Sequence, residues 1–255
     1  ALGELLIESL GIPKGVKFIT LTVRDSAYLE NLEPEKDFSY HNYRNGDIDN
    51  FVLAAETLAD LGFVVVRVGA KVKNEFKIKH PRIIDYAYTG KRTEFLDLYL
   101  AANCEFCIST MTGFDGLAHI FRRPIVFTNV LPMGYMLTST KGLIITKHHY
   151  SPKVKRRLTL NEIIDHKAIF PLDWKIYSNL GIEVQENSPE EILDVCLEML
   201  EILEGSHTIS NDDKFLQEKF WKTFPLCECI NSKPLHGKVR TRIGRSFLKQ
   251  TRLLE

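Results

Sequence analysis

Short apolar runs alternate along the chain with longer segments in which apolar residues recur every three to four positions. The short runs are rich in β-branched residues and bounded by turn residues, so they predict buried strands at 16–23, 63–68, 106–109, 125–127 and 143–145, with a further edge strand at 181–184. The longer segments predict helices at 47–61, 93–102, 114–121, 189–203, 213–220 and 241–248. Asp47 and Ser188 suit N-cap positions, and Gly62 suits the end of the first helix.

This order of strands and helices predicts the fold class. A repeated strand–helix–strand alternation is typical of an α/β protein, here with a doubly wound, mostly parallel sheet and helices on both of its faces. We expect a single domain over 1–255, in which 1–15 forms a linker or leading helix and 205–255 a C-terminal helical extension. Ligands of such folds bind beyond the carboxyl ends of the strands, so the residues that follow each strand are the candidates for function.

Composition and charge exclude several classes of protein. The chain is 44% hydrophobic and 26% charged, with 33 basic against 33 acidic residues, which is unlike a disordered chain and gives no overall attraction to nucleic acid. No window approaches the ~20 consecutive apolar residues of a membrane span, and the first residues lack a secretory signal, so we expect a cytoplasmic protein. Basic residues gather at 153–157 and 233–252, which indicates a solvated face or peripheral contact with an anionic surface such as the inner face of the cell membrane.

The five cysteines predict no disulfide framework, because their number is odd, and they favour a reducing compartment. Cys104 and Cys107 have CxxC spacing, but they lie in a strand-like run that points the two sulfurs to opposite faces. Cys227 and Cys229 have no histidine pair at zinc-finger spacing. We interpret all five as buried or incidental thiols.

Residues with phosphate-binding chemistry follow the predicted strands. Arg24 and Asp25 follow the first strand, Arg67 follows the second, and Asn129 lies beyond the fourth. The third strand ends in a turn of small residues that leads straight into a helix and contains Ser109, Thr110, Thr112 and Gly113. Such a turn lets a ligand approach the main chain, and the helix N-terminus attracts anions. We predict a phosphate or diphosphate cradle here, with Arg24 and Arg67 neutralising the remaining charge.

Each of these features also has a structural interpretation. The turn at 109–113 contains neither GxGxxG nor GxxxxGKS, so it is at least as typical of a helix cap and tight turn. Arg24 has an alternative role as an ion-pair partner of Asp25 or Asp47. Three histidines near strand or helix ends are better explained by packing or surface roles than by catalysis, namely His119, His148 and His149.

Five ordered segments resemble a known family. They are VRDSAYL at 23–29, HNYRNGDIDNF at 41–51, FVVVRVGAKV at 63–72, FCISTMTGFDGLAHIFRRPIVFTN at 106–129 and ITKHH at 145–149. Together they resemble a family of bacterial glycosyltransferases of surface-polysaccharide loci, similar to the GT-B class, in which two doubly wound domains face each other. The segment 106–129 is similar to the nucleotide-sugar half of that class, and Arg24 to an arginine of its fucosyltransferase-like branch. The chain resembles the C-terminal, donor-binding half, with the acceptor-binding half missing or carried elsewhere.

The resemblance implies a reaction and roles for individual residues. A sugar would pass from a nucleotide sugar to a cell-surface polysaccharide or lipid-linked acceptor, with no bound metal and no cofactor besides the donor. Arg24 and Arg67 would stabilise the leaving diphosphate, within a donor site that also includes Ser109, Thr110, Thr112, Gly113 and Asn129. Arg44, Asn45 and Asp47 would fix the sugar or their own loop. The general base would be Asp25 or Asp115, or would lie on the acceptor-binding half.

Three other functions are compatible with the same pattern. A non-catalytic nucleotide-sugar-binding module would have the same pocket without turnover. Another group transferase on this fold, such as a pyruvyl transferase, would share the turn at 109–113 and the FRRPIV segment. In a structural or scaffolding domain, the arginines after the strands would have no ligand.

Overall fold

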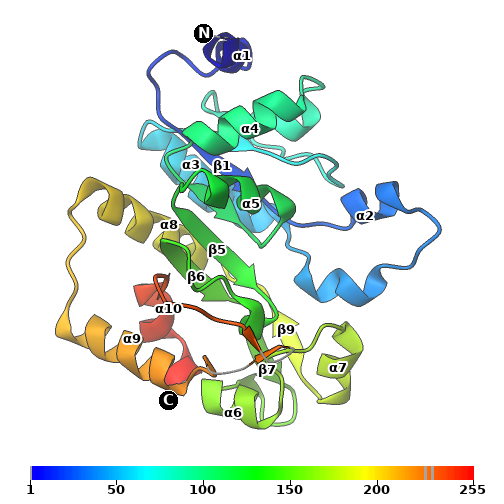
Figure 1. Cartoon of the computed structure of the whole chain (residues 1–255), viewed down its shortest axis with the longest axis vertical. Coiled ribbons are helices and arrows are strands. Elements are labelled where there is room, and N and C mark those ends of the chain that lie inside the picture. Colours follow the sequence, from blue (N-terminus) through cyan, green and yellow to red (C-terminus); the bar gives the residue numbers. More distant parts are fainter. Residues whose placement is uncertain (1, 227–228, 231–232) are drawn as a thin grey trace.

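The computed structural model describes residues 2–226, 229–230 and 233–255. Its centre is a sheet of seven strands, all parallel, in the order β12-β6-β5-β4-β1-β2-β3 (Figure 1). The strands are β1 (Phe18–Thr22), β2 (Val64–Arg67), β3 (Ile83–Asp85), β4 (Cys107–Ser109), β5 (Ile125–Val130), β6 (Gly142–Thr146) and β12 (Arg242–Ile243). The predicted α/β class with a largely parallel sheet is confirmed.

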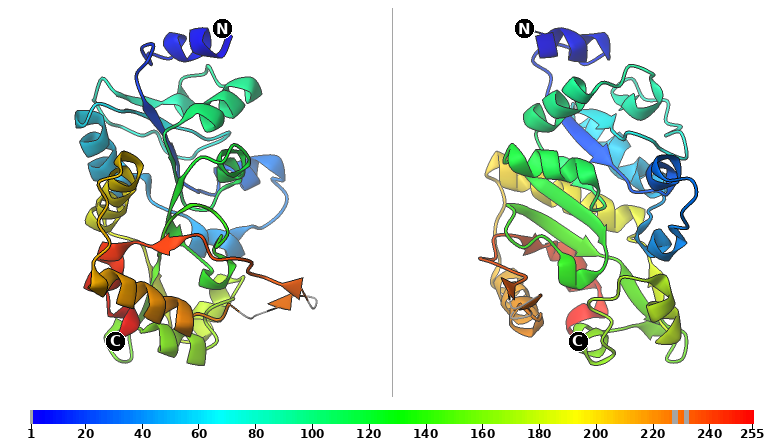
Figure 2. Two further views of the ribbon diagram at one scale, coloured as in Figure 1. Left: turned by 60° about the vertical axis from the view of Figure 1, so that its left-hand side comes forward. Right: turned by 45° about the vertical axis from the view of Figure 1, so that its right-hand side comes forward.

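Helices cover both faces of this sheet, which explains why its central strands are buried along their whole length. Every residue of β1, β2 and β5 is buried, so these strands show no polar alternation. On one face, α3 (Val52–Asp60) packs against α8 (Pro189–Glu204), and on the other α4 (Glu94–Asn103) packs against α5 (Gly113–Ile120) (Figure 2). The prediction of a doubly wound sheet is therefore confirmed.

Local sequence signals set the ends of these helices. The side chains of Thr93 and Ser188 accept hydrogen bonds from main-chain N–H groups at the starts of α4 and α8. Just beyond α3, Gly62 takes a φ of +100°, a conformation that favours glycine. The helix predicted from Asp47 instead opens as a 3₁₀ turn, η2 (Ile48–Phe51), before α3 begins.

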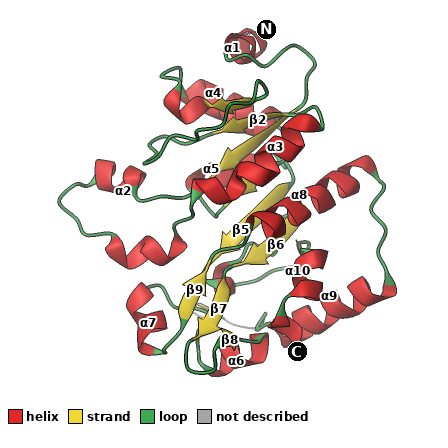
Figure 3. Ribbon diagram, turned by 180° about the vertical axis from the view of Figure 1, so that it is seen from behind, coloured by secondary structure: helices red, strands yellow, loops and turns green. Residues whose placement is uncertain are grey.

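A second, antiparallel sheet lies beyond the carboxyl ends of β5 and β6 (Figure 3). It pairs β7 (His148–Ser151) with both β8 (Arg156–Arg157) and β9 (Glu183–Gln185). The edge strand expected at 181–184 corresponds to β9, which joins this small sheet and not the main one. Two short helices flank it, α6 (Leu160–Asp165) and α7 (Trp174–Asn179).

The two ends of the chain also contribute regular structure. The leading segment forms α1 (Leu2–Ser9), and the C-terminal segment contains α9 (Asn211–Thr223) and α10 (Arg245–Gln250). The predicted helix at 241–248 is wrong at its start, because Arg242 and Ile243 form β12 and pair with β6. The remaining elements are α2 (Ala27–Leu32), β10 (Cys229–Ile230), β11 (Lys233–Pro234) and the 3₁₀ turns η1 (Ser39–Arg44), η3 (Tyr86–Tyr88), η4 (Met133–Tyr135) and η5 (Arg252–Leu254).

The connection between β2 and β3 departs from the usual pattern. These neighbouring parallel strands are joined by residues 68–82, which contain no helix or strand. Parallel strands are more often joined through a helix. Within the described part of the chain, none of the helices combines the length and the apolar character needed to cross a bilayer.

Candidate functional site

The candidate site lies where the strand order of the sheet reverses. The chain leaves β1 towards α3 on one face, and it leaves the adjacent β4 towards α5 on the other face. The two departing loops separate and open a crevice at the carboxyl ends of the strands, which is where ligands bind in folds of this type. A cavity of about 400 Å³ occupies this position. Its place agrees with the expectation from the sequence, and its volume suits a small molecule.

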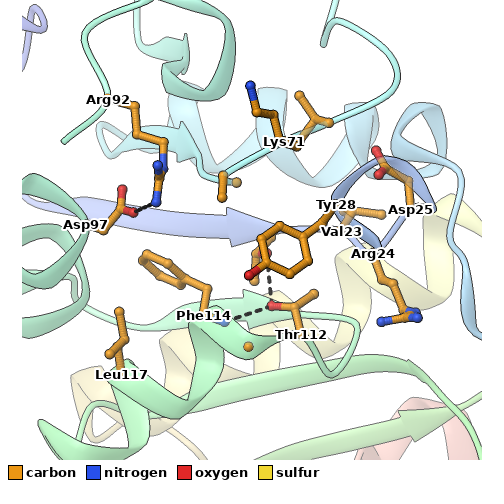
Figure 4. Close-up of a pocket in the computed structure, with 15 residues that line it drawn as sticks. Val23, Arg24, Asp25, Tyr28, Lys71, Arg92, Asp97, Thr112, Phe114 and Leu117 are labelled. Carbon is orange, nitrogen blue, oxygen red and sulfur yellow. Dashed lines mark hydrogen bonds and ion pairs between the residues drawn. The ribbon is translucent and has the colours of Figure 1, made fainter. Parts of the chain in front are cut away.

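Three segments line the cavity, together with Tyr28 of α2, Leu117 of α5 and two residues at the start of α4 (Figure 4). Residues 22–25 come from the end of β1, residues 69–72 from the loop after β2, and residues 112–114 from the start of α5. Arg92 and Asp97 lie at one end of the cavity, and Arg24 and Asp25 lie at the other. The wall between them is largely apolar and includes Tyr28, Val72, Phe114 and Leu117.

The N-terminus of α5 is fixed by a capping box. The Thr112 hydroxyl accepts a hydrogen bond from the Phe114 N–H at 3.3 Å, and the Asp115 carboxylate accepts one from the Thr112 N–H at 2.7 Å. Gly113, which has no side chain, and Phe114 line the cavity. A Cβ placed on Gly113 would meet no atom within 4 Å, so this helix end is open. The partial positive charge of a helix N-terminus favours an anion at such a position.

Two other residues predicted for the cradle are buried under the turn and stabilise it. Ser109 and Thr110 are buried and do not line the cavity. The Ser109 hydroxyl donates to Asp115 at 2.6 Å, and the Thr110 hydroxyl accepts from the Arg24 N–H at 2.7 Å. Their predicted contact with phosphate is therefore corrected: these hydroxyls hold the turn that presents Thr112 and Gly113.

Asp115 was a candidate general base, and the structure corrects this expectation. The side chain is buried, and one of its oxygens accepts hydrogen bonds from both Ser109 and Thr112. Burial raises the pKa of the carboxyl, although the bonds from Ser109 and Thr112 oppose the shift. Asp115 lies outside the cavity lining and caps α5.

The ligand-binding role predicted for Arg67 is also corrected, because the structure gives this residue a structural role. Its side chain is 2% exposed and lies outside the cavity lining. The guanidinium donates to both oxygens of Asp85 at 3.1 and 3.2 Å, and to the Asn74 carbonyl at 2.8 Å. This buried ion pair anchors the loop 68–82 against β3.

Asn129 is likewise engaged inside the protein, contrary to its predicted place beside phosphate. Its main-chain N–H donates to the side-chain oxygen of Asn187 at 2.7 Å, and the Asn187 N–H returns the same bond at 2.7 Å. Asn129 is buried and has a φ of +52°. The reciprocal pair joins the end of β5 to the segment after β9.

Asn45 and Asp47 fix their own loop, which is one of the two roles proposed for them. The Asn45 carbonyl accepts from Lys147 Nζ at 2.6 Å, and the Asp47 side chain caps η2. The Asp47 N–H donates to Glu186 at 3.0 Å. Glu186, which sequence reasoning missed, also accepts from Asn50 and lies 3.6 Å from Lys147 Nζ, so it joins the loop after β1 to the loop after β9.

Beside the cavity lies a group of four side chains that we call the arginine cluster, namely Arg24, His41, Tyr43 and Arg44. The Nε atoms of both arginines, Nδ1 of His41 and the Tyr43 hydroxyl are buried without a hydrogen-bond partner among the described residues. Arg44 reaches the Met111 carbonyl in the turn after β4 at 3.3 Å. Neither arginine forms an ion pair with a carboxylate in the described part of the chain, so the expected pairing of Arg24 with Asp25 or Asp47 is wrong.

The electrostatics of the arginine cluster favour an anion. Burial, and then the charge of Arg44, lower the pKa of the Arg24 guanidinium. Burial followed by the charges of both arginines lowers the pKa of His41. Burial raises the pKa of Tyr43, against the effect of the two arginines. Two mutually repelling guanidinium groups with unused buried donors present a site that an anion would stabilise.

Asp25 connects two walls of the cavity. One carboxylate oxygen accepts from the Ala27 N–H at 2.9 Å, and the other accepts from the Lys73 N–H at 2.7 Å. The side chain thereby holds the start of α2 against the loop 68–82. Figure 4 shows Arg24 and Asp25 leaving the loop after β1 in different directions.

The far end of the cavity was not expected from the sequence. Arg92 and Asp97 form an ion pair at 2.6 Å, and burial raises the pKa of the Asp97 carboxyl against the effect of Arg92. Arg92 lies just before α4 and Asp97 in its first turn, and α4 follows the unrecognised strand β3. Recognition of that strand would have marked the residues after it as candidates.

The cysteines and histidines have the expected structural roles where they are described. Cys104, Cys107 and Cys196 are buried free thiols, and burial raises the pKa of Cys104 to about 11. Cys227 lies outside the described residues, as does the side chain of Cys229. His119 contacts the Thr140 hydroxyl at 3.1 Å. His148 pairs with Glu191 at 2.8 Å, and burial lowers the pKa of His149 to about 4.

The described residues contain no group of three or more His, Cys, Asp or Glu side chains arranged to hold a metal ion. A scan against protein-family models and a search of curated proteins found no match to this chain. The features that indicate a function are therefore the cavity and the arginine cluster.

Proposed function

We propose that this chain is the donor-binding domain of a metal-independent, GT-B-like glycosyltransferase. The enzyme would transfer a sugar from a nucleotide sugar to a cell-surface polysaccharide or lipid-linked acceptor, in the cytoplasm or at the inner face of the membrane. One observation carries the proposal. At the switch point of the sheet, an open helix N-terminus lies beside a cavity with an apolar wall, together with two arginines that have no carboxylate partner among the described residues.

The cavity suits the parts of a nucleoside diphosphate. Its anionic diphosphate would lie at the main chain of Thr112 and Gly113, close to Arg24. The apolar wall, including Tyr28 and Phe114, would contact the base or the ribose. At the far end, the ion pair of Arg92 and Asp97 offers a donor and an acceptor for the polar edge of the base.

The proposed transfer breaks the bond between the anomeric carbon and the diphosphate oxygen and forms one to the acceptor hydroxyl. Negative charge then develops on the leaving diphosphate, and its stabilisation is the main electrostatic task. Arg24, Arg44 and the N–H groups of α5 would supply this stabilisation. The acceptor proton would go to a base on the acceptor-binding half, because both oxygens of Asp25 already accept main-chain hydrogen bonds.

The same observation on Asp25 favours a second candidate, a non-catalytic nucleotide-sugar-binding module. Asp25 and Asp97 are the carboxylates that line the cavity, and each has partners within the protein. Such a module would bind the donor without turnover. A product assay with a supplied acceptor and the acceptor-binding half distinguishes the two functions.

Thermal unfolding with a panel of nucleotides tests donor binding itself. Nucleoside diphosphates should raise the apparent stability by about 2.7 kcal/mol at a concentration of 100 times Kd, and the matching nucleosides should raise it much less. Arg24→Gln and Arg44→Gln should weaken this effect. Arg240→Gln removes an equal charge at the amino ends of the strands, away from the cavity, and serves as the control. Equal stabilisation by diphosphates and nucleosides would contradict the proposal.

A further inference from the structure

A second charged surface lies at the amino ends of three adjacent strands. Arg122 and Arg123 precede β5, Lys141 precedes β6, and Lys238 and Arg240 precede β12. Because β12, β6 and β5 are neighbours in the parallel sheet, these cations converge on one edge although they are far apart in sequence. They line a hollow of about 760 Å³, the basic groove, and the described residues that line it include no aspartate or glutamate.

The cations of the basic groove have no counter-charges in the described part of the chain, where none of the five forms an ion pair. The basic clusters seen in the sequence differ in this respect. Their arginines are largely neutralised in pairs, namely Arg156 with Glu162, Arg157 with Glu191, Arg242 with Asp213, Arg245 with Glu201 and Arg252 with Glu255. Unpaired arginines therefore gather in the groove, to which the sequence cluster at 233–252 contributes Lys238 and Arg240.

Apolar side chains stand beside these cations. Ile120 is 71% exposed and Phe121 is 43% exposed, and both directly precede Arg122 at the end of α5. A surface that combines unpaired basic residues with exposed aliphatic and aromatic side chains is typical of proteins that lie on anionic membranes. A nucleic-acid site would also use cations, but it would have no need of an exposed isoleucine.

We propose that the basic groove docks onto a bilayer that contains anionic phospholipids. The cations contact the lipid headgroups, while Ile120 and Phe121 reach the boundary of the acyl chains. The cavity lies at the other end of α5, about 10 Å away along the helix axis. Docking therefore leaves the cavity open to water, and membrane binding does not depend on the proposed donor site.

Flotation with lipid vesicles tests the proposal on the whole chain. The protein should bind vesicles of phosphatidylcholine with about 30% phosphatidylglycerol, chosen to give the negative surface that attracts basic residues, and it should not bind pure phosphatidylcholine. Binding should weaken as salt is raised from about 50 to 300 mM, because exposed charges are screened. The triple variant Arg122→Gln, Lys141→Gln, Arg240→Gln should reduce the partition coefficient about 100-fold, or about fivefold for each charge.

A matched triple variant controls for net charge. Lys14→Gln, Lys153→Gln and Lys249→Gln remove three exposed charges elsewhere and should change vesicle binding much less. An equal loss in both triple variants, binding to neutral vesicles, or no binding to anionic vesicles would overturn the proposal. Tighter binding to a DNA or RNA duplex, or release from vesicles by millimolar glycerol phosphate, would also overturn it. Melting temperatures verify that each variant folds, and nucleotide affinity should be unchanged in the groove variant.

Discussion

Replacing Gly113 with alanine adds one methyl group where the main chain of α5 meets the cavity. The unliganded protein has room for it, since a Cβ on Gly113 would meet no atom within 4 Å. Gly116, one turn further along the same helix, is equally open and lies outside the cavity lining. The two substitutions therefore differ in one respect, which is whether the methyl group faces the proposed diphosphate.

The magnitudes separate a binding role from a structural one. Glycine within a helix is less favourable than alanine by roughly 0.5–1 kcal/mol, so Gly113→Ala and Gly116→Ala should each leave stability unchanged or raise it within that range. A methyl group that displaces a phosphate from the N-terminus of α5 removes hydrogen bonds to a charged group, worth about 1.5–3 kcal/mol. Nucleoside diphosphate affinity should then fall roughly 10- to 150-fold in Gly113→Ala alone.

Isothermal titration with nucleoside diphosphates and urea unfolding measure the two quantities on the same preparations. Unchanged affinity in Gly113→Ala would show that the diphosphate does not approach α5. A parallel loss of affinity in Gly116→Ala would trace the effect to the helix as a whole. Either result would refute the placement of the phosphate, while leaving the basic groove as a separate question.

Further predictions concern stability and metal dependence. Burial raises the pKa of Glu198 to about 7, so the folded protein holds this proton more tightly than the unfolded chain, and stability should fall as pH rises from about 4.5 to 7. Glutamine does not titrate, so the free energy of unfolding of Glu198→Gln, measured by urea unfolding, should fall by about 3 kcal/mol less over this pH range than that of the original protein. Identical pH profiles of the two proteins would contradict this. Arg67→Met leaves Asp85 without its buried partner and should cost about 3–5 kcal/mol in unfolding free energy with little change in nucleotide affinity; a selective loss of affinity would return Arg67 to the donor site. EDTA should leave diphosphate binding unchanged in titrations, because arginines and main-chain N–H groups supply the positive charge; loss restored by Mg²⁺ would oppose the metal-independent assignment.

The helices and strands that could be predicted from the sequence are those with a clear signal in their own residues. The strands β1, β2 and β5 are buried along their whole length and are mostly apolar, and α8 carries its own cap in Ser188. Short strands were missed because they form only by pairing with strands that are distant in the sequence. The strand β3 has three partly buried residues after a polar loop, and β12 has two residues that pair with β6.

The same distinction holds for the candidate site. Topology located the crevice, and Arg24, Asp25, Thr112 and Gly113 do line it. A residue that follows a strand can also form hydrogen bonds or ion pairs within the protein. Its partner is then a distant residue, as Asp85 is for Arg67. The proximity of Arg44 to Arg24 also could not be predicted from local sequence. It depends on the path of the whole loop between β1 and α3, which no spacing rule describes.

The helix-free connection between β2 and β3 has a consequence for how this site changes in evolution or by design. The proposed phosphate end is made of the main chain at Gly113 and of the capping groups Thr112 and Asp115, whose replacement would disturb the turn itself. Residues 69–72 of the connection form a wall of the cavity, yet they belong to no helix or strand. The segment begins just after β2, and Arg67 and Asp25 fasten its far end through Asn74 and Lys73. Between β2 and these contacts, new side chains at 69–72 should alter which ligand the cavity accepts while the strands of the sheet stay unchanged.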